Sequence, residues 1–151
     1  MLPLNDTDPD TAALEVGMKF KSDLSGFVTG VRFYKYSANT GTHIGHLWTT
    51  TGTLLGTVTF TGETASGWQQ ATFATPIAIT ANTTYIVSYH MNGGRYATTN
   101  SGFTSAVDKP PLHAIANGSS PNGVYVYGTN SAFPNQTFNA TNYWVDVIFT
   151  P

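Results

Sequence analysis

The ten residues Phe27–Tyr36 read Phe-Val-Thr-Gly-Val-Arg-Phe-Tyr-Lys-Tyr, and they decide the fold class. Apolar and polar side chains alternate along the second half of this stretch, which is the pattern of a β-strand with one buried face. The predicted inward residues are Val31 and Phe33, and the predicted outward residues are Arg32, Tyr34 and Tyr36. A one-residue error in register would reverse the two faces.

Segments of the same kind recur along the chain, and no stretch keeps a helical period of 3.6 residues. Gly- and Asn-rich turns separate them, for example Asn92-Gly93-Gly94. The other predicted strands are Ala13–Phe20, Ile44–Trp48, Leu54–Thr61, Trp68–Ala74, Thr84–His90, Gly123–Tyr127 and Tyr143–Phe149, with a shorter one at Arg95–Thr98. Two long stretches, Asn100–Asn122 and Gly128–Thr141, are predicted to be irregular.

The pattern predicts an all-β protein, an antiparallel β-sandwich of jelly-roll or immunoglobulin-like type with about eight to nine strands. A chain of 151 residues fits one domain. We expect residues 1–12 to form a polar lead or linker and residues 13–151 to form a single module.

Composition narrows the class of partner. Charged residues make up 9% of the chain, against about 25% in ordinary soluble domains. The six Lys and Arg residues are scattered, which argues against nucleic-acid binding, and no apolar run approaches the ~20 residues of a membrane span. There is no cysteine for a disulfide or a thiolate zinc site. A surface of hydroxyl and amide groups with many aromatic rings suits neutral partners such as sugars.

Alternation on the later strands predicts further outward side chains. Trp68 faces outward because Ala71 and Phe73 form the apolar set of its strand. By the same argument Ser88 and His90 face outward between the inward Tyr85, Val87 and Tyr89, and Trp144 and Asp146 face outward between the inward Tyr143, Val145, Val147 and Phe149.

If successive strands alternate in direction, the loops at 37–43, 62–67, 91–94 and 128–141 share one end of the sandwich. This parity predicts a ligand-binding rim of His43, Glu63, Trp68, His90, Arg95, Tyr96, Tyr127 and Asn142. An aromatic ring can cover the apolar C–H face of a pyranose while amide, carboxylate, imidazole and guanidinium groups bond its hydroxyls. In this hypothesis Trp68 is the stacking platform.

Structural roles compete with ligand binding at each of these positions. The alternatives are an edge-covering Trp68, a turn braced by His90 and Arg95, a His43–Glu63 pair that joins two loops, and packing roles for Tyr127 and Trp48.

A second candidate surface is a sheet face that carries Tyr34, Tyr36 and Trp144. Flat aromatic strips of this kind can stack on extended polysaccharides. Arg32 and Asp146 can form an ion pair between the rings if their strands are neighbours. The alternative is that other segments cover the rings and leave a partly buried structural ion pair.

Metal binding and catalysis are weakly signalled. His43 and His46 stand three residues apart in an extended segment, where their side chains diverge. Glu15 could join backbone carbonyls around a structural Ca²⁺, and no other cofactor is expected. Glycoside hydrolysis needs two carboxylates about 5–9.5 Å apart, and the predicted rim offers only Glu63. We therefore expect a protein that is not an enzyme.

Five runs of the sequence are similar to a bacterial family of extracellular modules whose name records only an unknown function. They are Leu14–Phe20, Gly30–Lys35, Thr40–Trp48, Gly62–Gln69 and Asn142–Val147. The resemblance implies a β-sandwich appended, often in several copies, to exported multidomain proteins, some of them active on glycans. It transfers no binding or catalytic residue.

Two functions follow as expectations. The first is a non-catalytic carbohydrate-binding module in a secreted or cell-surface protein, with a polysaccharide or oligosaccharide and the other domains of its own chain as partners. The second is a structural or adhesive spacer without a dedicated ligand. The first residues lack the basic and apolar regions of a signal peptide.

Overall fold

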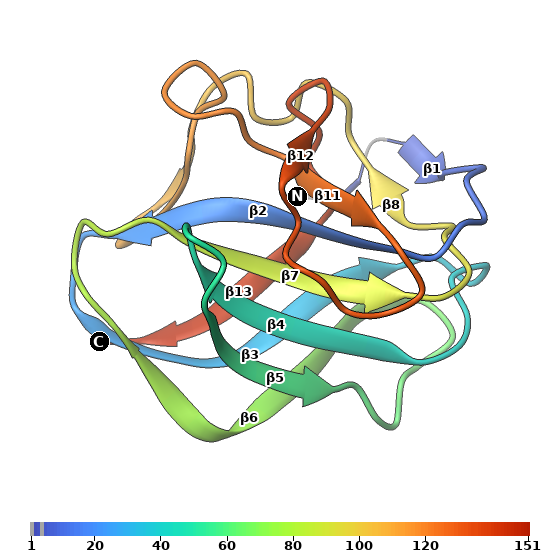
Figure 1. The fold of residues 1–151 in the computed structure, drawn as a ribbon, viewed down its shortest axis with the longest axis horizontal. Coiled ribbons are helices and arrows are strands. Elements are labelled where there is room, and N and C mark those ends of the chain that lie inside the picture. The colour runs from blue at the N-terminus through green and yellow to red at the C-terminus, as the bar shows by residue number, and fades with distance from the viewer. Residues whose placement is uncertain (1, 4) are drawn as a thin grey trace.

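The computed structural model describes residues 2–3 and 5–151, and that part of the chain consists of β-strands and loops without a helix (Figure 1). The strands are β1 (Asn5–Thr7), β2 (Leu14–Ser22), β3 (Gly26–Lys35), β4 (His43–Thr49), β5 (Leu54–Thr59), β6 (Gly67–Ile79), β7 (Tyr85–Met91), β8 (Ala97–Thr98), β9 (Val107–Lys109), β10 (Leu112–Ala114), β11 (Val124–Tyr127), β12 (Gln136–Thr137) and β13 (Val145–Thr150).

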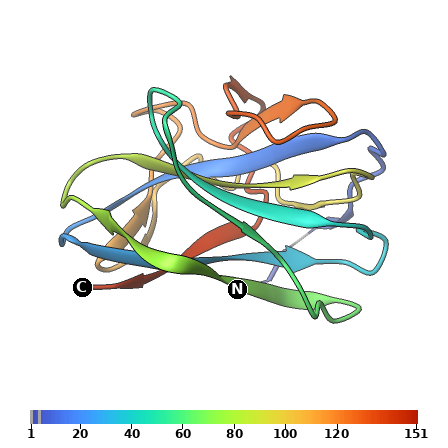
Figure 2. The same ribbon diagram turned by 60° about the horizontal axis from the view of Figure 1, so that its bottom comes forward.

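Two antiparallel sheets face each other as the layers of a β-sandwich (Figure 2). The larger sheet has the order β12-β11-β2-β7-β4-β5, with β10 paired to β2 and β9 paired to β10. The smaller sheet has the order β13-β3-β6, and β1 and β8 form a separate two-stranded sheet. The predicted all-β, antiparallel class is therefore confirmed.

The core lies between the two layers and is rich in aromatic rings. Phe33 of the smaller sheet stacks on Tyr89 of the larger one, with ring centroids 4.2 Å apart, and meets the edge of Phe60 at 4.9 Å. Such rings contribute most of the buried apolar area of a small core. The predicted inward residues are buried, namely Val31, Phe33, Ala71, Phe73, Tyr85, Val87, Tyr89, Tyr143, Val145 and Val147, and Phe149 packs against them partly buried.

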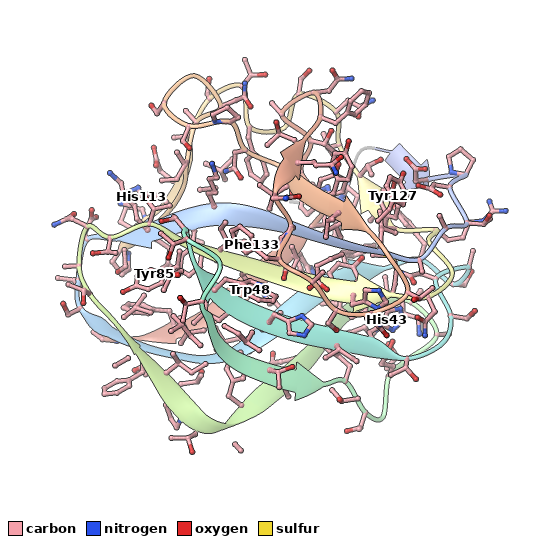
Figure 3. All side chains as sticks on the ribbon, viewed as in Figure 1. His43, Trp48, Tyr85, His113, Tyr127 and Phe133 are labelled. Carbon is pink, nitrogen blue, oxygen red and sulfur yellow. The ribbon has the colours of Figure 1, made fainter. Side chains whose placement is uncertain are left out.

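The outer face of the larger sheet is not a free surface. Ser88 and His90 point away from the core as predicted, yet they are 0% and 3% exposed. The cause is the chain between β11 and β12, which crosses this face and places Phe133 against Trp48, with ring centroids 5.6 Å apart (Figure 3). Trp48 consequently belongs to a second small cluster with Ile86 and Val124 instead of the main core.

The two stretches predicted to be irregular contain short strands. The first holds the hairpin of β9 and β10, which adds to β2, and the second holds β12, which pairs with β11. These strands are two or three residues long and do not show an alternation that a sequence pattern can reveal.

The N-terminal lead lies against the sandwich. Strand β1 pairs with β8, the backbone N–H of Asp8 donates to the carbonyl of Tyr96, and that of Arg95 donates to the carbonyl of Asp10. Gly94 adopts φ +61° beneath this contact, and a Cβ at Gly94 would lie 2.1 Å from the Asp10 carbonyl oxygen. The lead is therefore fitted to the turn that follows β7.

Candidate functional site

Strand pairing brings three of the predicted loops, 37–43, 62–67 and 91–94, to one end of the sandwich together with the start of the 128–141 segment. In the larger sheet His43 lies opposite Met91, Met91 opposite Leu14, and Leu14 opposite Tyr127. In the smaller sheet Lys35 lies opposite Gly67 at the corresponding end. Figure 3 shows His43 and Tyr127 at this end and His113 and Tyr85 at the other. The side chains predicted to form one rim nevertheless divide into separate groups.

His43 and Glu63 pair with each other and link two loops. The Nδ1 of His43 lies 2.9 Å from Oε2 of Glu63, while Lys35 Nζ lies 3.0 Å from Oε1 of the same carboxylate. The His43 side chain is fully buried, and its Nε2 lies 2.7 Å from Oδ1 of Asn39. Burial lowers the pKa of His43 below its usual 6.5, although the hydrogen bond to Glu63 opposes the shift. The structural alternative, a pair that joins two loops, is the one observed.

His90 and Arg95 anchor the chain at the same end. The Nε2 of His90 lies 2.8 Å from the carbonyl oxygen of Gly128, so the imidazole holds the segment that covers the larger sheet. Arg95 has φ +61° and binds the lead through its backbone N–H. The imidazole of His90 is too deeply buried to contact a ligand on the surface.

Trp68 joins the second predicted surface instead of the rim. Its ring meets Tyr34 edge-to-face at 5.5 Å and Trp144 at 6.4 Å, and Tyr34 in turn meets Tyr36 at 5.4 Å. Tyr34, Tyr36, Trp68 and Trp144 therefore make one continuous cluster on the outer side of the smaller sheet, which we call the aromatic face. Trp68 is its exposed centre, with 36% of its surface accessible.

Trp144 is more enclosed than its outward orientation predicts. It is 8% exposed, because it packs against Trp68 and its Nε1 donates to Oγ1 of Thr99 at 2.9 Å. Its backbone has φ +56°, an uncommon conformation for a bulky residue. Trp144 thus supports the aromatic face from its edge and offers little surface of its own.

The predicted ion pair lies within the aromatic face. Arg32 Nη2 and Asp146 Oδ2 are 3.0 Å apart, each side chain about one third exposed. The guanidinium carbon of Arg32 lies 4.4 Å from the centroid of the Trp68 ring, in the geometry of a cation–π contact. Asp146 also accepts the backbone N–H of Val147 through Oδ1 at 2.8 Å. The pair fixes a set of hydrogen-bond donors beside the exposed indole.

A cleft of about 280 Å³ opens beside the aromatic face, between β13 and the β2–β10 part of the larger sheet. Its walls are largely apolar, with Met18, Phe20, Phe103, Val145 and Val147 among them. Its polar lining includes Arg32, Asp146 and Asn142, and Trp68 and Trp144 line it too. Asn142 thus lies with Trp68, as expected, and its Oδ1 accepts the backbone N–H of Trp144.

Tyr96 and Tyr127 line a different cavity, at the junction of the lead and the sandwich. The antiparallel bridge between Thr99 and Asn142 separates the two cavities. Thr99 and Asn142 line the cleft, whereas Thr98 and Tyr143, their chain neighbours, line the other cavity. The sequence pattern does not reveal this cavity, because Asp8 and Asp10, which also line it, fall in the predicted polar lead.

Glu15, the residue considered for Ca²⁺, lies buried on the outer face of the larger sheet. Its Oε2 accepts the hydroxyl of Ser88 at 2.6 Å and lies 2.7 Å from Nδ1 of His46. In the part of the chain that the structure describes, no three His, Cys, Asp or Glu side chains are grouped as metal ligands.

The sequence profile of a protein family described as "Domain of unknown function (DUF4082)" matches residues 1–145. The chain belongs to this family. The DUF4082 match runs from the lead, through both sheets, to the first residue of β13, and it confirms the resemblance to a family of unknown function. No curated protein matches the chain. No helix among the described residues has the length and apolar character needed to cross a membrane.

Proposed function

We propose that this DUF4082 chain is a non-catalytic carbohydrate-binding module of an exported bacterial protein and that it holds sugar on the aromatic face. The observation that carries the proposal is the exposed indole of Trp68, set between Tyr34 and Trp144 with the guanidinium of Arg32 over its ring. An exposed ring beside fixed hydrogen-bond donors is the combination that a pyranose requires.

The neighbouring groups supply the polar half of such a site. Arg32 is held by Asp146 before any ligand arrives, so binding loses little side-chain entropy at this position. The guanidinium donates to sugar hydroxyls, while the Asp146 carboxylate accepts from them. Tyr34 and Tyr36 extend the ring surface along β3, which would favour a chain of several sugar units over a single one.

The charges at this site favour binding over hydrolysis. Among the described residues that line the cleft, Asp146 supplies the carboxylate, and it is already paired with Arg32. Hydrolysis of a glycosidic bond requires a second carboxyl group about 5–9.5 Å away. Release of new reducing ends from a polysaccharide by the purified chain would contradict this part of the proposal.

A structural or adhesive spacer is the second candidate. The observation in its favour is that the rings of the aromatic face pack on one another and that Trp144 is nearly buried. In that case the face only covers the smaller sheet.

Affinity electrophoresis on a panel of soluble polysaccharides tests the proposal. We expect at least one polymer to retard the chain and Trp68→Ala to weaken the interaction at least about tenfold, or about 1.4 kcal/mol. Phe27→Ala is the matched control, because Phe27 is an aromatic residue of the same sheet with 45% exposure at the far end of β3. It should retain full retardation. An absence of retardation across the panel would favour the spacer.

A further inference from the structure

The cavity between the lead and the sandwich has a volume of about 310 Å³, at the lower end of the range for small-molecule pockets. Its aromatic walls are formed by Tyr96, Tyr125, Tyr127, Phe138 and Tyr143, and its acidic side chains are Asp8 and Asp10. The described residues that line it include no lysine and no arginine. The cavity therefore combines aromatic rings with uncompensated negative charge.

The rings stand at steep angles to one another. Tyr125 and Tyr127 are 5.7 Å apart with an interplanar angle of 74°, and Tyr96 and Tyr143 are 5.6 Å apart at 67°. Tyr127 is exposed, so a solute can reach the ring wall from outside. Because the planes in each pair differ by 67° and 74°, the rings do not form a single flat stack along the cavity wall.

Hydrogen bonds keep the negative charge in place. Burial alone would raise the pKa of Asp10, but hydrogen bonds from the Tyr127 hydroxyl, the Ala12 N–H and the Tyr96 hydroxyl hold it below its usual 3.8. The same carboxylate raises the pKa of Tyr127 to about 12, so the phenol keeps its proton. At neutral pH the cavity holds ionised Asp10 beside neutral phenols.

Asp8 contributes a second carboxylate to the lining of the cavity. Its Oδ1 accepts the backbone N–H of Asp10 at 2.9 Å. Among the described residues, no lysine, arginine or histidine forms an ion pair with Asp8 or Asp10.

We propose that this cavity is a binding site for a small organic ammonium ion, with the cation against the tyrosine rings and facing Asp8. The face of an aromatic ring attracts a cation, and the attraction grows as water is excluded. The proposed sugar site offers a guanidinium beside its indole and would repel the same ion. Among the described residues the two sites share no lining residue, so this inference stands apart from the proposed function.

Titration of the full chain with choline, followed by NMR and calorimetry, tests the proposal. The matched control ligand is 3,3-dimethylbutan-1-ol, which has nearly the same shape without the charge. We expect choline to bind at least tenfold more tightly than the alcohol and to shift resonances of Tyr96 and Tyr127. Glucosamine and N-acetylglucosamine form a second pair, in which the first carries an ammonium group and the second does not. Preferential binding of glucosamine assigns the ammonium to an amino sugar, and choline binding without it assigns an alkylammonium compound.

Variants connect the affinity to the cavity. Tyr127→Ala removes an exposed wall, and Asp8→Asn removes one charge while it keeps the oxygen that accepts the Asp10 N–H. Each should weaken choline binding at least fivefold, whereas Trp68→Ala should leave it unchanged. Equal binding of choline and its neutral analogue, absence of choline binding, or unchanged affinity in both cavity variants with intact spectra would each overturn the proposal.

Discussion

The side chain of Asn122 takes the place of a strand residue in the larger sheet. Strand β11 pairs with the first half of β2 and β10 with the second half, which leaves a gap beside Lys19. Asn122 fills the gap, because its Oδ1 accepts the N–H of Lys19 at 2.8 Å and its Nδ2 donates to the Lys19 carbonyl at 3.0 Å. The amide also bonds the Ile115 carbonyl and the Gly123 N–H.

We expect Asn122→Ala to lower the free energy of unfolding by about 3 kcal/mol, because it leaves several buried backbone groups without partners at about 1–3 kcal/mol each. Urea denaturation measures the effect. Asn130→Ala is the control, since Asn130 is exposed in a loop of the same region and should change stability by less than about 0.5 kcal/mol. Equal stability of both variants would show that the Asn122 bonds contribute nothing.

The sequence could place Asn122 in a turn but could not reveal its role. Its partner Lys19 lies 103 residues away in the sequence, and a local pattern contains no information about such a pair. The direction of strand side chains could be predicted, as the buried Phe33 and the outward Trp68 show. The exposure of an outward residue could not be predicted, because His90 is covered by a segment that is distant in the sequence.

At the scale of elements, one histidine clamps the β9–β10 hairpin to the turn after β2. Nδ1 of His113 lies 2.7 Å from Oδ1 of Asp108, and its Nε2 lies 2.7 Å from Oδ2 of Asp23. The hydrogen bonds to Asp23 and Asp108 raise the pKa of His113 above its usual 6.5. The protonated ring donates from both nitrogens, to Asp108 of β9 and to Asp23 after β2, and so reinforces the backbone pairing of β10 with β2.

The clamp predicts a pH dependence of stability. A group whose pKa is raised by folding stabilises the fold fully below its unfolded pKa, here 6.5, and this contribution is lost as the pH rises through the folded value. We expect the melting temperature of the natural chain to exceed that of His113→Gln most at about pH 5–6. The difference should shrink at higher pH. Subtraction of the two curves removes the opposite dependence from His43, whose pKa is lowered.

A constant difference between the two proteins from about pH 5 to 9 would contradict the clamp. NMR titration of the His113 ring gives an independent measurement of its pKa.

The long strands were predictable because alternation and turn residues define them, and β2, β3, β4, β6 and β7 all lie within a few residues of their predicted positions, apart from the end of β6. The short strands were not. The hairpin β9–β10 forms because it can extend the edge of β2, and its exposed residues Val107–Lys109 show no apolar pattern.

At the level of the whole molecule, the N-terminal lead is docked on the sandwich at the turn after β7. Gly94 is the contact point, because a Cβ there would meet the Asp10 carbonyl oxygen and its φ is positive. We expect Gly94→Ala to displace residues 5–12, to increase their cleavage in limited proteolysis, and to weaken choline binding in the adjoining cavity. Gly93→Ala is the matched control, since a Cβ at Gly93 meets no atom of the described residues within 4 Å. Protection of the lead in both variants would show that the docking does not depend on this close approach.

Strand parity placed the loops at 37–43, 62–67 and 91–94 at one end, but it did not show that the 128–141 segment crosses the larger sheet to reach Trp48, and it could not sort the side chains into sites. Glu63 turned toward Lys35 and His43, whereas Trp68 turned onto the outer side of the smaller sheet. A local pattern predicts the strand on which a residue lies. Which side chains that residue contacts depends on packing between strands that are far apart in the sequence.

The Thr99–Asn142 bridge lies between the cleft beside the aromatic face and the cavity lined by Tyr96 and Tyr127. A single rung of backbone divides them, with Thr99 and Asn142 turned to one chamber and Thr98 and Tyr143 to the other. A ligand that displaces this bridge changes the shape of both cavities at once. Thermodynamic linkage then requires the effect to be mutual. If a ligand in one cavity changes the affinity of the other cavity for its ligand by some factor, the second ligand changes the affinity for the first by the same factor.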